Sequence, residues 1–154
     1  MIREMKLEDY EEVKELFYEV HNLHLENRPD IYIDGNPLPL KYFEELLNDK
    51  ENLNYAYILD NKVVGILTAD IKTTMDNYII KARKICFIES LGVKENYQHQ
   101  GIGRKLYEYL KNEVKSKNID AIELNVWGFN ENAIRFYESL GMNIKNIKYE
   151  DTNL

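Results

Sequence analysis

The chain has 154 residues, a length that suits one domain over residues 1–154 with its own hydrophobic core. Its 44% hydrophobic and 31% charged residues fit a globular protein, and its net charge of -7 argues against nucleic-acid binding, which relies on basic patches. No apolar stretch is long enough to span a membrane, and the single cysteine, Cys86, suits a reducing compartment, so we expect a cytoplasmic protein with no membrane partner.

The first half of the chain predicts a strand, two helices and a hairpin. Residues 1–5 could form an opening strand, and residues 6–27 carry apolar side chains spaced by three or four, which indicates an amphipathic helix. Prolines and a glycine mark residues 28–39 as a loop, and residues 39–49 predict a second helix. Two apolar runs around an Asp-Asn-Lys turn within residues 53–71 are typical of a β-hairpin.

The second half alternates strands with helices. Residues 75–83 either extend the hairpin or form a loop, whereas the apolar, β-branched run at residues 84–93 predicts a central strand. A helix with apolar residues every four positions begins at Gly101, and another strand is expected at residues 120–127. A short capped helix then precedes residues 142–150, whose alternation predicts a closing strand. The order β-α-α-β-β-β-α-β-α-β fits an α/β (α+β) fold, with a mixed sheet and helices on both faces.

The turn "QGIG" places Gly101 and Gly103 where the first N–H groups of a helix lack intrahelical partners. These groups lie at the positive end of the helix dipole, so the turn is suited to bind an anion, usually phosphate. A plain tight turn is the alternative for an isolated pair of glycines. A dinucleotide-binding fingerprint would need a third glycine at the position of Leu106, and a P-loop would need Gly-Lys-Ser/Thr, which is missing.

Residues 89–110, "ESLGVKENYQHQGIGRKLYEYL", resemble the acetyl-CoA motif of the GNAT superfamily of N-acetyltransferases. That motif reads Arg or Gln, two residues, Gly, one residue, and Gly or Ala, and Gln98, Gly101 and Gly103 fill it. A second block, "NENAIRFYESLGM", is similar to the family's asparagine followed by Phe-Tyr-x-x-x-Gly. The resemblance implies a mostly antiparallel sheet in which one parallel pair of strands is splayed.

The resemblance also implies how acetyl-CoA binds as the co-substrate. Backbone amides from Gln98 to Arg104 would wrap the pyrophosphate, the strand at residues 91–93 would pair with the pantetheine arm inside the splay, and Asn132 would contact the same ligand. The implied binding residues are Leu91, Gly92, Val93, Gln98, His99, Gln100, Gly101, Ile102, Gly103, Arg104 and Asn132.

Acetylation of an amine needs a base, an oxyanion donor and an acid for the leaving thiolate. Glu89 is the candidate base, because a carboxylate inside the apolar run "CFIESL" is expensive to bury without a reason. The alternative is that Glu89 is a solvated strand residue, or one bonded to a neighbouring backbone group at a bulge. Tyr137 matches the family tyrosine that commonly protonates the thiolate, and a core aromatic residue is the alternative there. The backbone N–H groups of residues 91–93 are the expected oxyanion donors.

The acceptor region is expected around the loop that follows the first helix. The candidate substrate residues are Arg28, Asp30, Tyr32 and Trp127. An aspartate and a tyrosine in this loop could receive a cationic amine. His21 and His24 share a helix face, but no third ligand is evident, so no metal site is expected.

The sequence therefore predicts an acetyl-CoA-dependent N-acetyltransferase in which a primary amine attacks directly. Its acceptor would be a small-molecule or peptide amine of unidentified structure, and a homodimer is a further expectation. The alternative is a non-catalytic acyl-CoA-binding sensor or interaction module.

Overall fold

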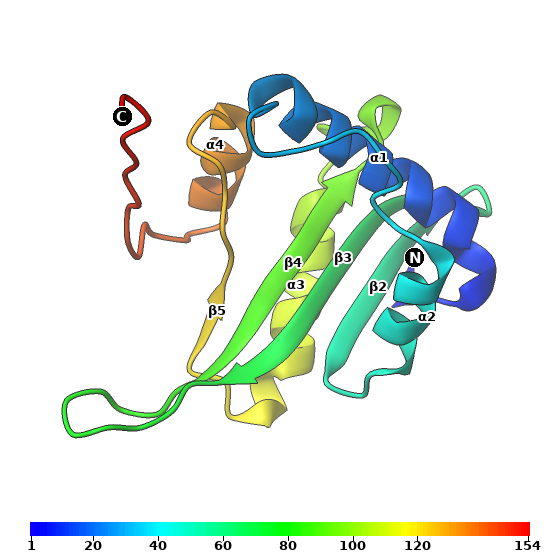
Figure 1. Ribbon diagram of the computed structural model, residues 1–154. Coiled ribbons are helices and arrows are strands. Elements are labelled where there is room, and N and C mark those ends of the chain that lie inside the picture. The colour runs from blue at the N-terminus through cyan, green and yellow to red at the C-terminus, as the bar shows by residue number, and fades with distance from the viewer.

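The computed structural model describes residues 1–154 as a five-stranded sheet in the order β1-β2-β3-β4-β5, with helices on both faces (Figure 1). Neighbouring strands are antiparallel except β4 and β5, which are parallel. This confirms the predicted mostly antiparallel sheet with one parallel pair. The elements are β1 (Ile2–Glu4), α1 (Tyr10–Asn27), α2 (Leu40–Asn48), β2 (Asn52–Leu59), β3 (Lys62–Thr73), β4 (Lys84–Val93), α3 (Ile102–Val114), β5 (Ala121–Glu123) and α4 (Glu131–Ser139). Short 3-10 turns lie at Leu7–Asp9, Glu95–Tyr97 and Lys115–Lys117.

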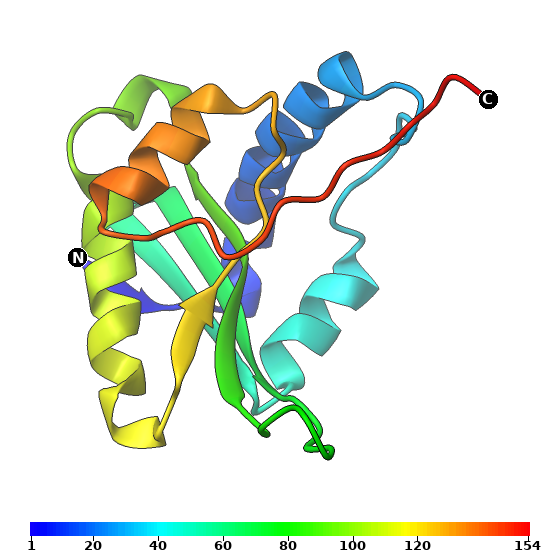
Figure 2. The ribbon, with the colours of Figure 1, turned by 90° about the vertical axis from the view of Figure 1, so that its left-hand side faces the viewer.

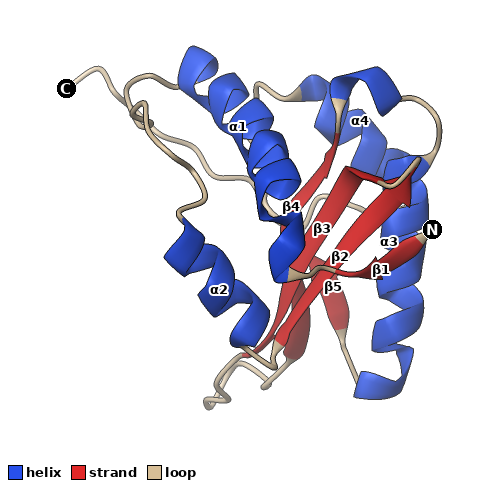
Figure 3. Ribbon diagram, turned by 90° about the vertical axis from the view of Figure 1, so that its right-hand side faces the viewer, coloured by secondary structure: helices blue, strands red, loops and turns tan.

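Two apolar cores lie on opposite faces of the sheet. One core is formed with α3, whose Ile102, Leu106, Leu110 and Val114 recur every four residues and are all buried. The other core is formed with α1 and α2 and includes Val13 and Phe43. Figure 3 shows α1 and α2 on one side of the strands and α3 on the other. None of the helices is long and apolar enough to cross a bilayer.

The segment between β3 and β4, which the sequence left open, is a loop at the tip of a long hairpin. Figure 1 shows it projecting beyond the sheet. Asn77 orders the tip, because its Oδ1 accepts the amides of Ile79 and Ile80 at 2.9 and 3.0 Å. Thr74 closes the base of the loop by donating its amide to the carbonyl of Arg83 at 2.8 Å.

The predicted closing strand at residues 142–150 is wrong, and the strand expected at residues 120–127 forms only at Ala121–Glu123. Residues 143–154 make no backbone–backbone hydrogen bond. Side chains hold this C-terminal segment instead, through Lys145 to Glu123 at 2.7 Å and Glu150 to Arg28 at 2.7 Å. Figure 2 shows it crossing in front of the chain that leaves β5. Alternation specifies which side chains share a face, but a strand also needs backbone bonds to a neighbouring edge, and this segment makes none.

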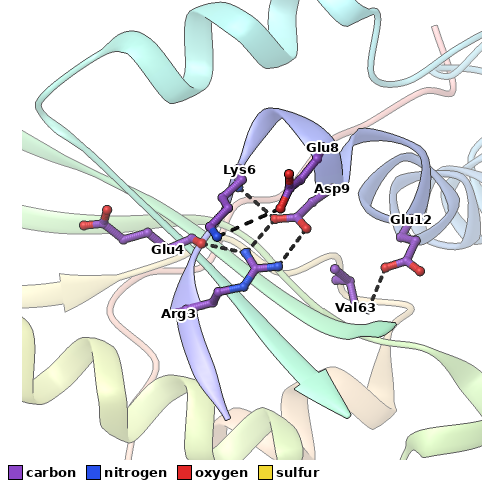
Figure 4. Close-up of polar contacts among 7 residues, drawn as sticks. All are labelled: Arg3, Glu4, Lys6, Glu8, Asp9, Glu12 and Val63. Carbon is purple, nitrogen blue, oxygen red and sulfur yellow. Dashed lines mark hydrogen bonds and ion pairs between the residues drawn. The ribbon is translucent and has the colours of Figure 1, made fainter. Parts of the chain in front are cut away.

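Hydrogen bonds to the buried carboxylate of Asp9 hold the first strand against the segment that leads into α1 (Figure 4). Arg3 donates to both oxygens of Asp9, at 2.8 and 2.9 Å, and the Lys6 amide donates to the same carboxylate at 2.8 Å. Glu12, one turn further along, accepts the amide of Val63 at 2.7 Å. Burial opposes ionisation of Asp9, but the hydrogen bonds from Arg3 and Lys6 outweigh it and hold the Asp9 pKa below its usual value.

We expect Asp9→Asn to lower the free energy of unfolding by about 1–3 kcal/mol at pH 7, because it weakens hydrogen bonds around a buried group. The Asp9 pKa is lower in the folded state than in the unfolded chain. The stabilisation is therefore present above about pH 4, the ordinary aspartate pKa, and is lost as the pH falls through the folded pKa. Urea unfolding at pH 7 and pH 3 measures this, with Glu8→Gln as the control at an exposed carboxylate. An equal loss at both pH values would contradict the assignment.

Candidate active site

The parallel strands β4 and β5 separate after three residue pairs. Ile85, Cys86 and Phe87 pair with β5, and the last pair joins Phe87 to Glu123. Strand β4 continues to Val93 and stays paired with β3 on its other side, with Leu67 opposite Leu91 and Gly65 opposite Val93. Beyond Phe87, the edge of β4 that faces β5 therefore has no strand partner. The structure thus contains a splay, and Leu91, Gly92 and Val93 lie along it.

A run of unpaired backbone amides follows at the turn into α3. Gly101 has a left-handed φ of 80°, and His99 has one of 62°. The amides of residues 99–104 donate to no backbone or side-chain acceptor, and the Lys105 amide is the first that is bonded, to the carbonyl of Gly101 at 3.0 Å. This anion cradle begins one residue later than the sequence predicts. The Gln98 amide donates to Glu95 at 3.3 Å, and its side chain donates to the carbonyl of Val93 at 3.0 Å.

The two glycines of the cradle are needed for different reasons. Gly101 supplies a backbone conformation that other residues adopt at a cost, and no other atom lies within 4 Å of where its Cβ would be. A Cβ at Gly103 would lie 2.9 Å from Cζ of Phe136, so this glycine permits close packing of α3 on α4. Arg104 strengthens the same contact by donating to the carbonyl of Ser139 at 2.9 Å. Its guanidinium is thus directed to α4.

Helix α4 carries the predicted acid, Tyr137. Burial raises the pKa of Tyr137 to about 12, so its hydroxyl holds its proton at neutral pH, and no other residue is hydrogen-bonded to it. Asn130 caps the helix by accepting the amide of Ala133 at 3.2 Å. Asn132 is exposed in the first turn and accepts a bond from Arg135 at 2.7 Å. Figure 1 places this helix beside the end of β4 where the splay opens.

Glu89 is not buried as its apolar neighbours suggested, and it matches the alternative of a solvated strand residue at a bulge. Its side chain is 47% exposed and pairs with Lys72 at 3.2 Å. The cause is a bulge: Ile88 pairs with Ala69 and Ser90 with Thr68, so Glu89 has no partner in the ladder. Cys86, three positions before Glu89, is fully buried, and burial raises the pKa of its thiol to about 11.

The candidate substrate residues lie together. Trp127 donates its indole N–H to the hydroxyl of Tyr32 at 3.0 Å, and the Arg28 guanidinium lies 5.1 Å from the Trp127 ring centroid. Arg28 also pairs with Asp30 at 2.7 Å and with Glu150 at 2.7 Å. The Asp30 carboxylate is therefore already neutralised, which weakens the idea that it receives a cationic amine.

Two residues that the sequence did not assign complete an aromatic cluster with Tyr32 and Trp127. His24 stacks on Tyr32 with centroids 5.0 Å apart, and Phe129 stacks on Trp127 at 6.1 Å. His24 and Phe129 meet edge to face at 6.2 Å, so the four rings form a closed circuit. Burial, with a smaller contribution from His21, lowers the pKa of His24. The sequence suggested a metal ligand or a solvated or capping residue at the helix end for His24, and its stacking partners were missed because they are distant in sequence.

A small polar pocket adjoins this aromatic cluster between the end of α1 and the start of α4. Its volume is about 270 Å³, and its lining residues are Leu23, Asn27, Phe129, Asn130, Glu131 and Asn132. The pocket joins the acceptor-side cluster to Asn132 of the second sequence block.

Comparison with known proteins agrees with this geometry. A sequence profile described as the Acetyltransferase (GNAT) family matches residues 17–142. The chain therefore belongs to the GNAT family of acetyltransferases, whose members transfer an acetyl group to an amine. The family accounts for the splayed parallel pair and for the order of the helices and strands.

Individual relatives are N-acetyltransferases or proteins of the same fold. N-alpha-acetyltransferase 60 of Xenopus tropicalis is 32% identical over 114 residues, which are 66% of this chain and 47% of that protein. The ribosomal protein bS18-alanine N-acetyltransferase of Escherichia coli K12 is 39% identical over 59 residues, which are 38% of this chain and 40% of that protein. The crystal structure of a mutant of the BH1408 protein from Bacillus halodurans has a TM-score of 0.97 at 31% identity, covering 100% of this chain and 99% of that one. The matches to these two curated relatives span less than half of their length.

We expect Gly101→Ala to lower the free energy of unfolding by about 1–2 kcal/mol, the cost of a left-handed conformation for a residue with a Cβ. Gly128→Ala is the matched control, because a Cβ there meets no atom within 4 Å and its φ is ordinary. Urea unfolding of both variants measures the difference. Equal stability of the two variants would show that Gly101 is not conformationally required.

Proposed function

We propose that residues 1–154 act as one acetyl-CoA-dependent N-acetyltransferase domain that transfers acetyl to a primary amine by direct attack. The observation that carries this proposal is a pair of unpaired backbone stretches, the β4 edge beyond Phe87 and the amides of residues 99–104. Backbone N–H groups at a helix N-terminus suit the pyrophosphate of CoA, and an open strand edge suits its amide-containing pantetheine arm. Family membership supports the same ligand.

The roles of the chain's own residues follow from their surroundings. Residues 91–93 and the cradle at residues 99–104 hold the donor, and the amides of residues 91–93 polarise the carbonyl that is attacked. Glu89 takes a proton from the amine, directly or through water, because its carboxylate is exposed on the strand that leads into the splay. Tyr137 gives its proton to the thiolate, since its hydroxyl stays protonated and is free of other partners.

The acceptor is a small-molecule or peptide amine that enters beside the aromatic cluster of His24, Tyr32, Trp127 and Phe129. Two relatives are named for acetylation of an alpha-amino group and of an alanine, which supports testing peptide N-termini first. The lone buried Cys86 supports a reducing, cytoplasmic location for the proposed enzyme.

A homodimer joined through the C-terminal segment, residues 143–154, is part of this proposal. The backbone of this segment bonds to no other backbone group, and Ile144 and Ile147 are 69% and 65% exposed. A second copy, related by a two-fold axis, would pair with this backbone and cover the two exposed isoleucines. We expect light scattering of the eluted protein to give a dimer mass, and Ile147→Lys to shift it toward monomer while Ile79→Lys, at the exposed hairpin tip, does not. A monomeric wild type would exclude the dimer.

The donor site is tested first, without an acceptor. CoA at about 100 times its Kd would stabilise the native state by about 2.7 kcal/mol, seen as a raised melting temperature, whereas free adenosine serves as the control. Thiol release is then followed over a panel of peptides and small amines. CoA binding without thiol release would favour the non-catalytic sensor, and absence of CoA stabilisation would overturn the proposal.

We expect Tyr137→Phe to lower kcat by about 10²-fold or more, the usual contribution of a positioned acid, with little change in CoA affinity. Tyr149→Phe is the control, because Tyr149 is 87% exposed on the C-terminal segment. Thiol release measures kcat, and the melting shift with CoA measures binding. Unchanged kcat in Tyr137→Phe would remove Tyr137 from the mechanism.

A further inference from the structure

The chain places one of its own amines at the proposed base. Lys72 Nζ lies 3.2 Å from Oε1 of Glu89 and 3.9 Å from Oδ1 of Asp70. It also lies 4.2 Å from the centroid of the Phe87 ring. Lys72 is a primary alkylamine, which is the kind of nucleophile that the proposed reaction consumes.

Strand register brings these groups to one face of the sheet. Asp70 pairs with Phe87 in the β3–β4 ladder, and Lys72 follows Asp70 by two positions, so both project to the same side. The bulged Glu89 reaches the same side two positions beyond Phe87. Neighbouring Cys86 and Ile88 belong to the core on the α3 side, so the four residues occupy the opposite face.

The contact has the geometry that base catalysis requires. A general base must lie within about 2.6–3.2 Å of the atom that gives up the proton, and the Lys72–Glu89 distance meets this limit. Pairing of β4 with β5 ends at Phe87, so the splay begins beside Glu89. Leu91, on the proposed donor edge, lies two residues further, roughly 7 Å along the strand at about 3.3 Å per residue.

Lys72 is not locked in its ion pair. Its side chain is 50% exposed and that of Glu89 is 47% exposed, so the pair is of the solvated kind that contributes little to stability. Asp70 competes only weakly with Glu89 for the Lys72 ammonium. Its Oδ1 is buried and accepts no hydrogen bond, because the 3.9 Å that separates it from Lys72 Nζ is too long for a hydrogen bond. The amine can therefore leave the carboxylates and turn toward the splay.

We propose that Lys72 is a self-acetylation site of this chain, an inference that rests on the proposed acetyltransferase function. The Lys72 ammonium passes one proton to Glu89, and its nitrogen attacks the thioester carbonyl carbon of acetyl-CoA. The N–C bond forms, the C–S bond breaks, the second proton from nitrogen goes to water, and the thiolate takes a proton from Tyr137. The products are Nε-acetyl-Lys72 and CoA.

Acetylation changes the charge of the site. Asp70, Lys72 and Glu89 together carry one net negative charge, and loss of the lysine charge leaves two. The neutral amide no longer pairs with Glu89, which is then free to meet the ammonium of an incoming acceptor. Self-acetylation would thus prepare the site for its external substrate.

The test is to incubate the full chain with isotope-labelled acetyl-CoA and no added amine, and to follow each lysine by mass spectrometry after Glu-C digestion. Lys62 and Lys81 are matched controls, because both are exposed on the same hairpin and neither has a carboxylate partner. Lys72 is expected to be labelled at least about tenfold faster than either, since a positioned base contributes at least that much. The rate at Lys72 should not depend on protein concentration, as expected for a reaction within one chain.

Two variants separate enzymic labelling from chemical labelling. Glu89→Gln and Tyr137→Phe should lower the rate at Lys72 to that of Lys62 and Lys81, while labelling of those two lysines stays unchanged. Equal labelling of all three lysines in the wild type, or an unchanged Lys72 rate in Glu89→Gln, overturns the inference. If panel amines are acetylated while Lys72 is not, the inference fails and the proposed function stands. If CoA does not stabilise the protein and no amine or lysine is labelled, both fail.

Discussion

The separation of β4 from β5 is the constraint on which the rest of the site depends. Strands in a sheet normally satisfy each other's N–H and C=O groups, and a buried group left without a partner is costly. Here only three pairs are made, ending at Phe87 and Glu123, while β4 runs on to Val93. A turn in which the amides of Lys94, Tyr97 and Gln98 are bonded follows the open edge, and the unpaired amides of residues 99–104 come after it. The order of these unpaired backbone groups along the chain matches a long ligand that has an amide-bearing arm and terminal phosphates.

The cradle is held in place by close contacts around two glycines. A Cβ at Gly65 would lie 2.9 Å from Cγ2 of Ile102, so the absence of a side chain at Gly65 allows the first turn of α3 to pack closely on β3. On its other side, Gly103 admits the ring of Phe136. The N-terminus of α3 is therefore fixed between the sheet and α4 before any ligand arrives. Such preorganisation lowers the entropic cost of binding.

The periodic and turn-forming parts of the sequence predicted α3 and its start well, for reasons that are local. Apolar residues every four positions placed α3, and a glycine in a left-handed conformation placed its N-cap at Gly101. Features that depend on register escaped prediction. The apolar neighbours of Glu89 suggested burial, but a bulge set by pairing with Thr68 and Ala69 turns its side chain to solvent.

The closing strand does not form, and the Gln98 amide is bonded within the chain, for related reasons. Alternation in residues 142–150 records a pattern of side chains, yet a strand forms only against an available edge, and β5 ends at Glu123. The Gln98 amide was assigned to the cradle from the motif alone, whereas the preceding 3-10 turn uses it to bond Glu95. In both cases the missing information was the partner of a backbone group, which tertiary structure decides.

The proposed donor and acceptor sides differ in what they are made of, and this explains why sequence motifs point to a donor site and not to an acceptor. The donor side is backbone, and a few glycines at fixed spacing suffice to position it. The acceptor side is made of side chains from distant segments: Tyr32 from the loop after α1, Trp127 beyond β5, and Glu150, which reaches Arg28 from the C-terminal segment. Its charged groups already contact one another, so an acceptor would have to displace or join an existing contact. In the proposed enzyme, acceptor specificity would therefore depend on how readily the Arg28 and Lys72 ion pairs open, a property of packing that no short motif encodes.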